Sequence, residues 1–349
     1  MLIALLVFSF LIFFHELGHF LAARFFGVHV EVFSIGFGKR ILTKKFGATE
    51  WSISLIPLGG YVRMKGQDDS DPSLKSYDED SYNAKTPFQR IIISLAGPFA
   101  NFLLAFLLYL SMTFIGLPKI LTTLADVNTT HPAYKAGIRT GDTITSINGT
   151  PTIYWEDVSQ NIHQEAKLLN VTVLREGQYI DLKIMPIEYK TKNRFGEIKT
   201  RYIIGVSADQ KVTQTIHYTL ENGLDYAYNK TIDSSMYIFN SLKKLVMGEI
   251  PLENLGGPVG ILNVTSQVSQ MGIVFLLAFA ALISVNLGVI NLLPIPALDG
   301  GHVMFHTYEL ISKKPANEDI MFKLTLLGWS ILLSLMLLGL YNDINRLLE

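Results

Sequence analysis

The chain has 349 residues, of which 49% are hydrophobic and only 17% are charged, and its formal net charge is −1. Soluble domains normally carry about 25% charged residues, so this composition indicates a membrane protein, and the lack of a basic excess argues against a nucleic-acid partner. Because the chain has no cysteine, disulfides and thiolate-ligated metal sites are excluded, and any metal site must use His, Asp or Glu.

Four apolar stretches are long enough to cross the hydrocarbon core of a bilayer, which takes about 20 residues of helix. We expect these four transmembrane helices within 1–27, 91–118, 272–301 and 324–341. The first stretch could be taken for a signal peptide, but such a peptide starts with positive charge, and the first basic residue here is Arg24. We therefore interpret it as a span.

Two different regions separate the first span from the second. Glycines interrupt 28–66 at short intervals, which predicts short strands, and we expect a membrane-associated β-hairpin region there. The following stretch, 67–90, begins with an acidic segment of low hydrophobicity, and we expect it to form a cytoplasmic loop.

A small inserted α+β domain is predicted at 124–188. Three β-like runs that alternate with turns cover 143–147, 171–175 and 179–185. The sequence of 131–142, followed by Ile147-Asn148-Gly149, resembles a PDZ domain. That resemblance implies binding of an extended peptide by strand addition at a sheet edge. The alternative is a PDZ-like fold that acts only as a steric plug.

The segment after this domain, 210–271, has helix-compatible spacing and ends in a loop rich in glycine and proline before the third span. The sequence of Gly256–Ile261 within that loop leaves its role open.

The charges of the short loops indicate the orientation of the chain. Basic residues occur between spans one and two and between spans three and four: Lys39, Arg40, Lys44, Lys45, Arg63, Lys65, Lys313, Lys314 and Lys323. Because Lys and Arg accumulate in cytoplasmic loops, both loops should be cytoplasmic. The PDZ-like domain and both termini should then lie on the outer face.

His15, Glu16 and His19 form an H-E-x-x-H motif inside the first span. Residues four apart lie on the same face of a helix, so both imidazoles can reach one metal ion, with Glu16 beside them as a general base. Ionisable groups inside an apolar span are costly, and a divalent cation would compensate them. The alternative is that both histidines only mark the interfacial end of the span.

Catalytic zinc usually takes three protein ligands, and the extended motif with a third histidine is absent from this chain. Asp299 is the best candidate for the third ligand. It follows a helix break that Pro294 and Pro296 introduce, and it precedes Gly300 and Gly301. The alternative is a plain Asp-Gly turn that ends a helix at the interface.

Together these motifs resemble the site-2 protease family of intramembrane zinc metalloproteases, and they are most similar to its bacterial RseP-type regulators of sigma-factor signalling. Besides the two catalytic motifs and the PDZ-like insert, the resemblance includes stretches at 33–38, 57–62 and 96–101. The best-known members carry two tandem PDZ domains, whereas this sequence has one clear copy, since 188–211 is too short for a second.

The resemblance implies a polytopic α-helical membrane protein in the bacterial inner membrane that uses zinc and cleaves transmembrane segments of single-pass proteins, such as an anti-sigma factor or signal-peptide remnants. It implies zinc binding by His15, His19 and Asp299, with Glu16 activating a water molecule at the metal. The residues that it implies for contact with the substrate are Gly59, Gly60, Tyr61 and Asn291.

Two other classes of function remain open at this point. A metal transporter would also place His and Asp in spans, but it would rarely need a glutamate between two ligands or a PDZ-like domain. A catalytically inactive membrane scaffold would keep the PDZ-like domain, yet it would have no use for Glu16 within the membrane.

Overall fold

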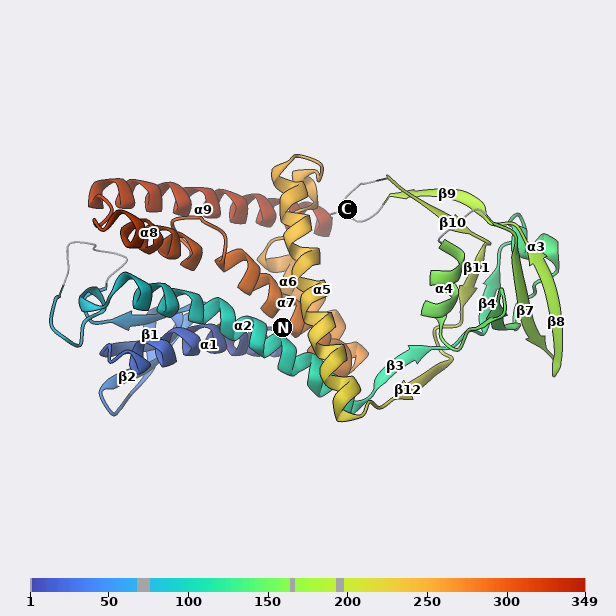
Figure 1. The fold of residues 1–349 in the computed structure, drawn as a ribbon, viewed down its shortest axis with the longest axis horizontal. Helices are drawn as coiled ribbons and strands as arrows, with labels where there is room; N and C mark the ends of the chain where they lie inside the picture. The colour runs from blue at the N-terminus through green and yellow to red at the C-terminus, as the bar shows by residue number, and fades with distance from the viewer. Residues whose placement is uncertain (1, 68–75, 164–166, 193–197, 349) are drawn as a thin grey trace. The chain divides into compact units, whose positions relative to one another are not determined.

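The computed structural model describes residues 2–67, 76–163, 167–192 and 198–348, and these form two compact units. One unit combines Met1–Met112, Leu220–Val246 and Leu255–Glu349, and the other combines Thr113–Thr219 with Met247–Asn254. The first is mainly helical and the second is mainly built of strands (Figure 1). Part of the predicted acidic loop, residues 68–75, lies outside the described residues.

Within the described ranges, four helices are long and apolar enough to cross a membrane: α1 (Leu2–Phe25), α2 (Pro87–Ile115), α7 (Ile273–Asn291) and α9 (Glu318–Leu348). Each falls on one of the predicted spans. In the most apolar 18-residue stretch of α9, only 11% of the residues are buried, as expected for a helix that faces lipid.

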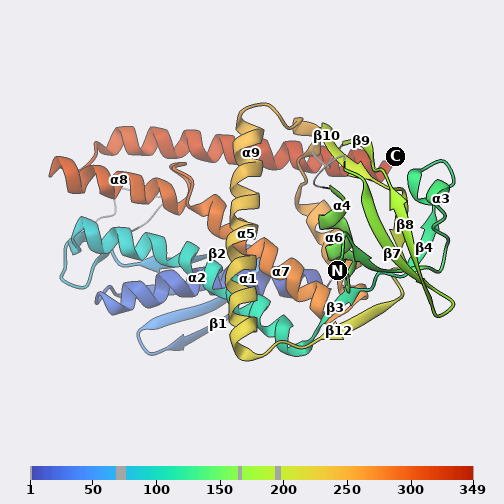
Figure 2. The same cartoon turned by 45° about the vertical axis from the view of Figure 1, so that its right-hand side comes forward.

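Three further α-helices belong to this unit: α5 (Leu220–Val246), α6 (Pro258–Met271) and α8 (Asp299–Ser312). The predicted third span therefore divides into two helices, because Pro294 and Pro296 lack the N–H groups that a continuous helix needs. Helix α8 lies beside α9, while α5 runs across the direction of the long helices (Figure 2).

Two long strands, β1 (Val30–Phe46) and β2 (Thr49–Met64), form the β region after α1. Val32 pairs with Arg63 on one side and with Glu50 on the other, so the first half of β1 lies between the two halves of β2 in the sheet. The strand bends near Gly36 and Gly38, whose positive φ angles of 92° and 81° glycine adopts without strain. Residues 60–64 consequently form an edge, and no described strand pairs with their outer side.

This β region packs on α1 through aromatic side chains. The rings of Phe33 and Trp51 are stacked at 4.4 Å, and Phe20 of α1 meets both of them edge-on. Ala23, Val28 and Val30 are almost fully buried in the cluster beneath them. The packing holds the edge formed by 60–64 over the helix that carries the H-E-x-x-H motif.

The second unit contains a four-stranded sheet in the order β6–β5–β7–β8 and three strand pairs, β3–β12, β4–β11 and β9–β10. Its strands are β3 (Leu117–Ile120), β4 (Leu124–Val127), β5 (Thr143–Ile147), β6 (Thr150–Pro151), β7 (Leu169–Arg175), β8 (Gln178–Ile184), β9 (Ile187–Lys192), β10 (Ile198–Ile203), β11 (Val206–Ala208) and β12 (Thr213–Ile216). Its helices are α3 (Pro132–Ala136) and α4 (Trp155–His163).

Strands β5, β7 and β8 occur where the sequence predicts them, and their inward side chains form an apolar core around Ile144, Val171 and Val173. The unit is wider than the predicted 124–188, because β3, β11 and β12 belong to it as well. The two ends of its longer segment, Thr113–Thr219, meet, since the Tyr218 N–H donates to the Thr113 carbonyl at 3.2 Å.

The glycine-rich segment at Gly256–Ile261 has a clear structural role. The carboxylate of Asp343, buried near the end of α9, accepts hydrogen bonds from the Gly257 N–H at 3.0 Å and the Gly260 N–H at 2.7 Å. The first N–H groups of a helix have no partner within the helix, so Asp343 caps α6 from a distant position. A β-carbon on either glycine would lie within 2.8 Å of a carboxylate oxygen, so the close approach requires glycine.

Candidate metal centre and active site

His15 and His19 project from one face of α1, as their spacing of four residues requires. Their Nε2 atoms lie 3.3 Å apart, and His19 is 8% exposed. The Nδ1 atom of His19 is 2.8 Å from the carbonyl oxygen of Ile93 on α2. Because a carbonyl only accepts, Nδ1 carries the hydrogen and Nε2 presents a lone pair to the space between the two rings.

Asp299 begins α8 directly after the proline-containing break, and its carboxylate lies against both imidazoles. Its Oδ1 is 3.3 Å from His19 Nε2, and its Oδ2 is 3.2 Å from His15 Nε2. A β-carbon on Gly300 or Gly301 would come within 2.4 Å of the carbonyl of Leu293 or Ile295, so the tight turn that presents Asp299 requires both glycines.

The chemistry of these three side chains fits a zinc ion. One possible ligand atom from each of them lies within 4.8 Å of the other two, and tetrahedral zinc sites use this combination of imidazole and carboxylate ligands. Asp299 Oδ2 is buried and accepts no hydrogen bond from any described residue, which is costly unless a cation occupies the space before it. No other described cluster of three or more His, Asp or Glu side chains has this geometry.

Helix α2 supports both histidines. A β-carbon on Gly97 would lie only 2.1 Å from His19 Nε2, so the imidazole packs directly on the helix backbone. Asn101 is fully buried, and its Nδ2 lies 3.0 Å from His15 Nδ1. Sequence reasoning gave neither residue a role at the metal, although both lie in the stretch 96–101 that contributed to the family resemblance. A small residue and a polar residue within an apolar span could have indicated this role, because such residues occur where membrane helices pack closely.

Glu16 lies beneath the edge formed by 60–64. A β-carbon on Gly60 would be 3.0 Å from Glu16 Cγ, so the strand backbone passes directly over this side chain. The candidate catalytic pocket between them is lined by His15, Glu16, His19, Gly60, Tyr61, Val62, Met64, Gln67, Tyr82, Ile93, Ser94, Asp299 and His302.

Of the four residues predicted to contact substrate, two line this pocket, namely Gly60 and Tyr61. The Tyr61 hydroxyl accepts a hydrogen bond from Arg40 Nη2 at 3.2 Å. Gly59 packs against the Phe37 ring, and Asn291 is the last residue of α7, half-buried and outside the pocket lining.

A profile of peptidase family M50 matches residues 3–335, which is nearly the whole chain and includes every element of the site. This chain belongs to peptidase family M50. It is a membrane zinc metalloprotease of the site-2 type, as the sequence resemblance predicted, and the alternatives of a metal transporter and an inactive scaffold are not supported.

Individual relatives of this M50 protease match over the same extent. "Putative zinc metalloprotease Cj1068" of Campylobacter jejuni is 42% identical over 99% of this chain and 94% of its own length. A Helicobacter pylori protein with a corresponding name is 36% identical over 99% of both chains. The regulator of sigma-W protease RasP of Bacillus subtilis is 30% identical over 98% of this chain and 97% of its own length.

Proposed function

We propose that this M50 protease hydrolyses peptide bonds within transmembrane segments of single-pass membrane proteins, as a step of regulated intramembrane proteolysis. The observation that carries the proposal is the convergence of His15, His19 and Asp299 beside Glu16 on helices of membrane-spanning length. The relative named as a regulator of sigma-W supports an anti-sigma factor as substrate, and signal-peptide remnants form the second substrate class.

In this proposal His15, His19 and Asp299 would hold the zinc ion, which would act as a Lewis acid toward the scissile carbonyl and lower the pKa of water. The carboxylate of Glu16 takes the proton of the attacking water and later delivers it to the amide nitrogen that leaves. Glu16 lies beneath Gly60 and lines the same pocket as the three candidate ligands and the edge strand, which supports this role.

The substrate would bind as an unwound strand along residues 60–64. A peptide bond in a helix is shielded by the hydrogen bonds of the helix itself, so the segment must open before water can attack it. An unpaired strand edge offers backbone hydrogen bonds to such a segment whatever its side chains are. Gly60 and Tyr61 would contact the substrate backbone there, with Gly59 and Asn291 close to its path.

The strand-rich second unit would act as a PDZ-like domain on the outer face, together with both termini, in a chain that crosses the inner membrane four times. The basic residues of the two short loops support this orientation. The unit would exclude substrates that still carry a folded outer domain. The ends of its longer segment, Thr113 and Thr219, are bridged by the β3–β12 pair, so a short linker could replace this segment without stretching α2 or α5.

The central test compares the purified protein with its Glu16→Gln and Asp299→Asn variants on a single-pass substrate reconstituted in vesicles. The wild type should bind one zinc per chain and cut within the apolar segment. Glu16→Gln should keep zinc and lose cleavage, whereas Asp299→Asn should lose both. A Glu16→Gln protein that still cuts would refute the assignment of the base, and cleavage only outside the apolar segment would refute intramembrane proteolysis.

The domain proposal has its own test, in which the longer segment of the second unit, Thr113–Thr219, is replaced by a short linker. The shortened enzyme should keep zinc, and it should cut a substrate with a folded outer domain that the complete enzyme refuses. Equal refusal by both enzymes, with zinc retained, would show that the unit is not a gate.

A further inference from the structure

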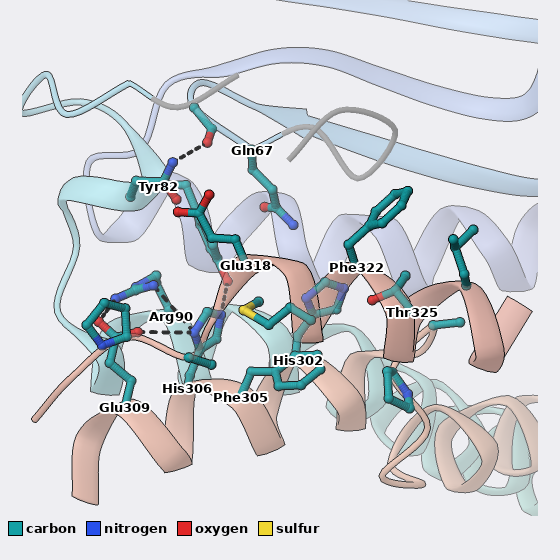
Figure 3. A pocket seen from close by; sticks show the side chains of 18 of the residues that line it. Gln67, Tyr82, Arg90, His302, Phe305, His306, Glu309, Glu318, Phe322 and Thr325 are labelled. Atoms are coloured by element: carbon teal, nitrogen blue, oxygen red, sulfur yellow. Dashed lines mark hydrogen bonds and ion pairs between the residues drawn. The ribbon is translucent and has the colours of Figure 1, made fainter. Parts of the chain in front are cut away.

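Helix α8 carries Asp299 as its first residue, so the placement of the whole helix decides where this carboxylate lies. Residues of α8 and α9 line a cavity of about 490 Å³ (Figure 3). Side chains that border a cavity lack packing partners on that side, so the position of α8 depends on the contacts of its other faces.

A polar cluster joins α8 to α2. Arg90 of α2 donates from Nη2 to Glu309 Oε1 at 2.8 Å and from Nη1 to His306 Nδ1 at 3.4 Å (Figure 3). His306 is only 7% exposed. Arg90 lies one helical turn before Ile93, whose carbonyl oxygen is bonded to His19. Neighbouring turns of α2 therefore hold both α8 and a candidate zinc ligand of α1.

Tyr82 extends this cluster to the edge strand. Burial and the charge of Arg90 lower the pKa of His306 to about 3, so the imidazole is neutral. Its Nδ1 accepts from Arg90, so Nε2 carries the hydrogen and donates it to the Tyr82 hydroxyl at 2.9 Å. The backbone N–H of Tyr82 donates to the carbonyl of Lys65 at 2.8 Å, directly after the edge formed by 60–64.

The cluster acts on the face of α8 that carries Asp299. His306 follows Asp299 by seven residues, which is two turns and about 11 Å along the axis, so both lie on the same face. The turn at Gly300 and Gly301 holds the start of α8, and the cluster holds it two turns later. Without the cluster the helix could tilt about that turn, and Asp299 would move relative to the two histidines.

We propose that Tyr82 and Arg90 are positioning residues of this protease, which hold α8 so that Asp299 keeps its place beside His15 and His19. Through its backbone bond, Tyr82 also ties α8 to the edge on which the substrate would lie. The proposal rests on the proposed function, because it names residues that act on the candidate metal centre from outside it.

The role of Tyr82 is tested with Tyr82→Phe, which keeps the ring and the backbone bond to Lys65. It leaves the buried Nε2–H of His306 without its acceptor. Zinc affinity, measured by competition with a chelator, should fall by about 10-fold. Tyr77→Phe is the matched control, because it makes the same change in the same segment on a side chain that is 72% exposed, and its zinc affinity should equal that of the wild type.

Cobalt(II) bound in place of zinc separates a change of position from a change of stability. The visible absorption bands of cobalt depend on the geometry of its ligands. Tyr82→Phe saturated with cobalt should show shifted bands, because Asp299 has moved, whereas lower stability alone leaves the bands of the folded, metal-bound protein in place. With a single-pass substrate, kcat should fall by about 10-fold and KM should change by less than about twofold, because the edge strand keeps its backbone bond.

The role of Arg90 is tested by exchanging the partners of its ion pair. Arg90→Glu and Glu309→Arg each place like charges together, so each should weaken zinc binding by about 10-fold. The double variant restores opposite charges and should recover at least about threefold of the affinity.

Unchanged zinc affinity in Tyr82→Phe would overturn the role of Tyr82, and so would a loss of affinity with unshifted cobalt bands. A double variant that binds zinc no better than the weaker single variant would overturn the role of Arg90. Failure of the proposed function is distinguishable from both outcomes, because the wild-type enzyme with full zinc would then cut no substrate within its membrane segment.

Discussion

Asn101 Nδ2 lies 3.0 Å from Nδ1 of His15, which joins α2 to a candidate zinc ligand 86 positions away in the sequence. A zinc-bound imidazole that uses Nε2 carries its hydrogen on Nδ1 and needs an acceptor for it. Asn101 Oδ1 is buried and has no hydrogen-bond partner among the described residues. A half-turn of the amide would bring this oxygen to His15 and satisfy both groups.

We therefore expect Asn101→Leu to weaken zinc binding by about 10- to 100-fold, the usual effect of removing a residue that orients a ligand. Asn101→Asp, which keeps an acceptor in the same place, should retain most of the affinity. Competition with a chromogenic chelator measures both values on purified protein. Unchanged affinity in Asn101→Leu would mean that the contact does not orient His15.

Asp343 should determine the stability of α6 within the bundle. Asp343→Ala leaves the N–H groups of Gly257 and Gly260 buried without their acceptor, which costs about 1–3 kcal/mol. Amide hydrogen exchange at the start of α6 should accelerate accordingly, while exchange in α1 stays slow. Asp343→Asn keeps one acceptor oxygen and should lose about half as much protection. If both variants exchange like the wild type, the cap is not what holds α6.

The sequence predicted those parts of the fold that depend on local patterns. Spans follow from runs of apolar residues, the shared face of His15 and His19 follows from the helical period, and the break before Asp299 follows from two prolines. The partners of these residues could not be derived in this way. Asn101 and Asp343 act on residues more than eighty positions away, and long-range packing alone decides which faces of two apolar helices meet.

In the second unit, too, local patterns predicted some of the strands, whereas long-range pairing could not be predicted. Turns such as Asn148-Gly149 mark β5, which begins and ends where expected. The short strands β11 and β12 carry little pattern of their own, and their membership depends on pairing with β4 and β3 across about eighty to one hundred residues. The same pairing explains why a deletion limited to 124–188 would remove β4 and leave β11 without its partner.

The stability of the second unit should fall in acid because of Asp142. Its side chain is only 1% exposed, and this burial opposes ionisation of the carboxyl group. Arg175 donates two hydrogen bonds to the carboxylate, at 2.7 and 2.8 Å. These hydrogen bonds outweigh the effect of burial, so the pKa of Asp142 lies below its usual value. A carboxyl group with a lowered pKa stabilises the fold above its unfolded pKa of about 3.9, and this contribution is lost as the pH falls through the lower folded value.

Hydrogen exchange of β5 and β7 peptides, measured after equilibration between pH 6 and pH 3, should therefore report a loss of protection only below about pH 4. Asp142→Asn should be destabilised by about 1–3 kcal/mol at pH 6 and should show less further change in acid. A variant that matches the wild type at pH 6 would show that the Arg175 pair does not stabilise the unit.

Gly97 is predicted to be essential for metal binding. Gly97→Ala would place a β-carbon 2.1 Å from His19 Nε2, so the imidazole must leave its position. A displacement of about 1 Å at a reacting centre can cost 100-fold, and here the displaced atom belongs to a proposed zinc ligand, so both zinc content and cleavage should fall. Gly256→Ala is the matched control, because its new β-carbon has no neighbour within 4 Å. Full zinc content in Gly97→Ala would contradict the prediction.

Gly60→Ala should differ from Gly97→Ala, because it should keep zinc and lose only cleavage. A β-carbon at this position would lie 2.8 Å from both Ile12 Cγ2 and the Ser34 carbonyl and 3.0 Å from Glu16 Cγ. The edge strand must therefore move away from α1, and the side chain of Glu16 shifts with it. His15 and His19 are anchored from α2, so their positions do not depend on this contact.

Gly60→Ala should accordingly bind zinc with wild-type affinity and lower kcat by about 10- to 100-fold, since only the placement of Glu16 and of the substrate strand changes. Gly256→Ala again serves as the control for the added methyl group. Loss of zinc in Gly60→Ala would show that the edge strand also holds the ligands in place. Unchanged kcat would show that the strand can shift outward without disturbing Glu16, and the active edge would then have to lie elsewhere on the β region.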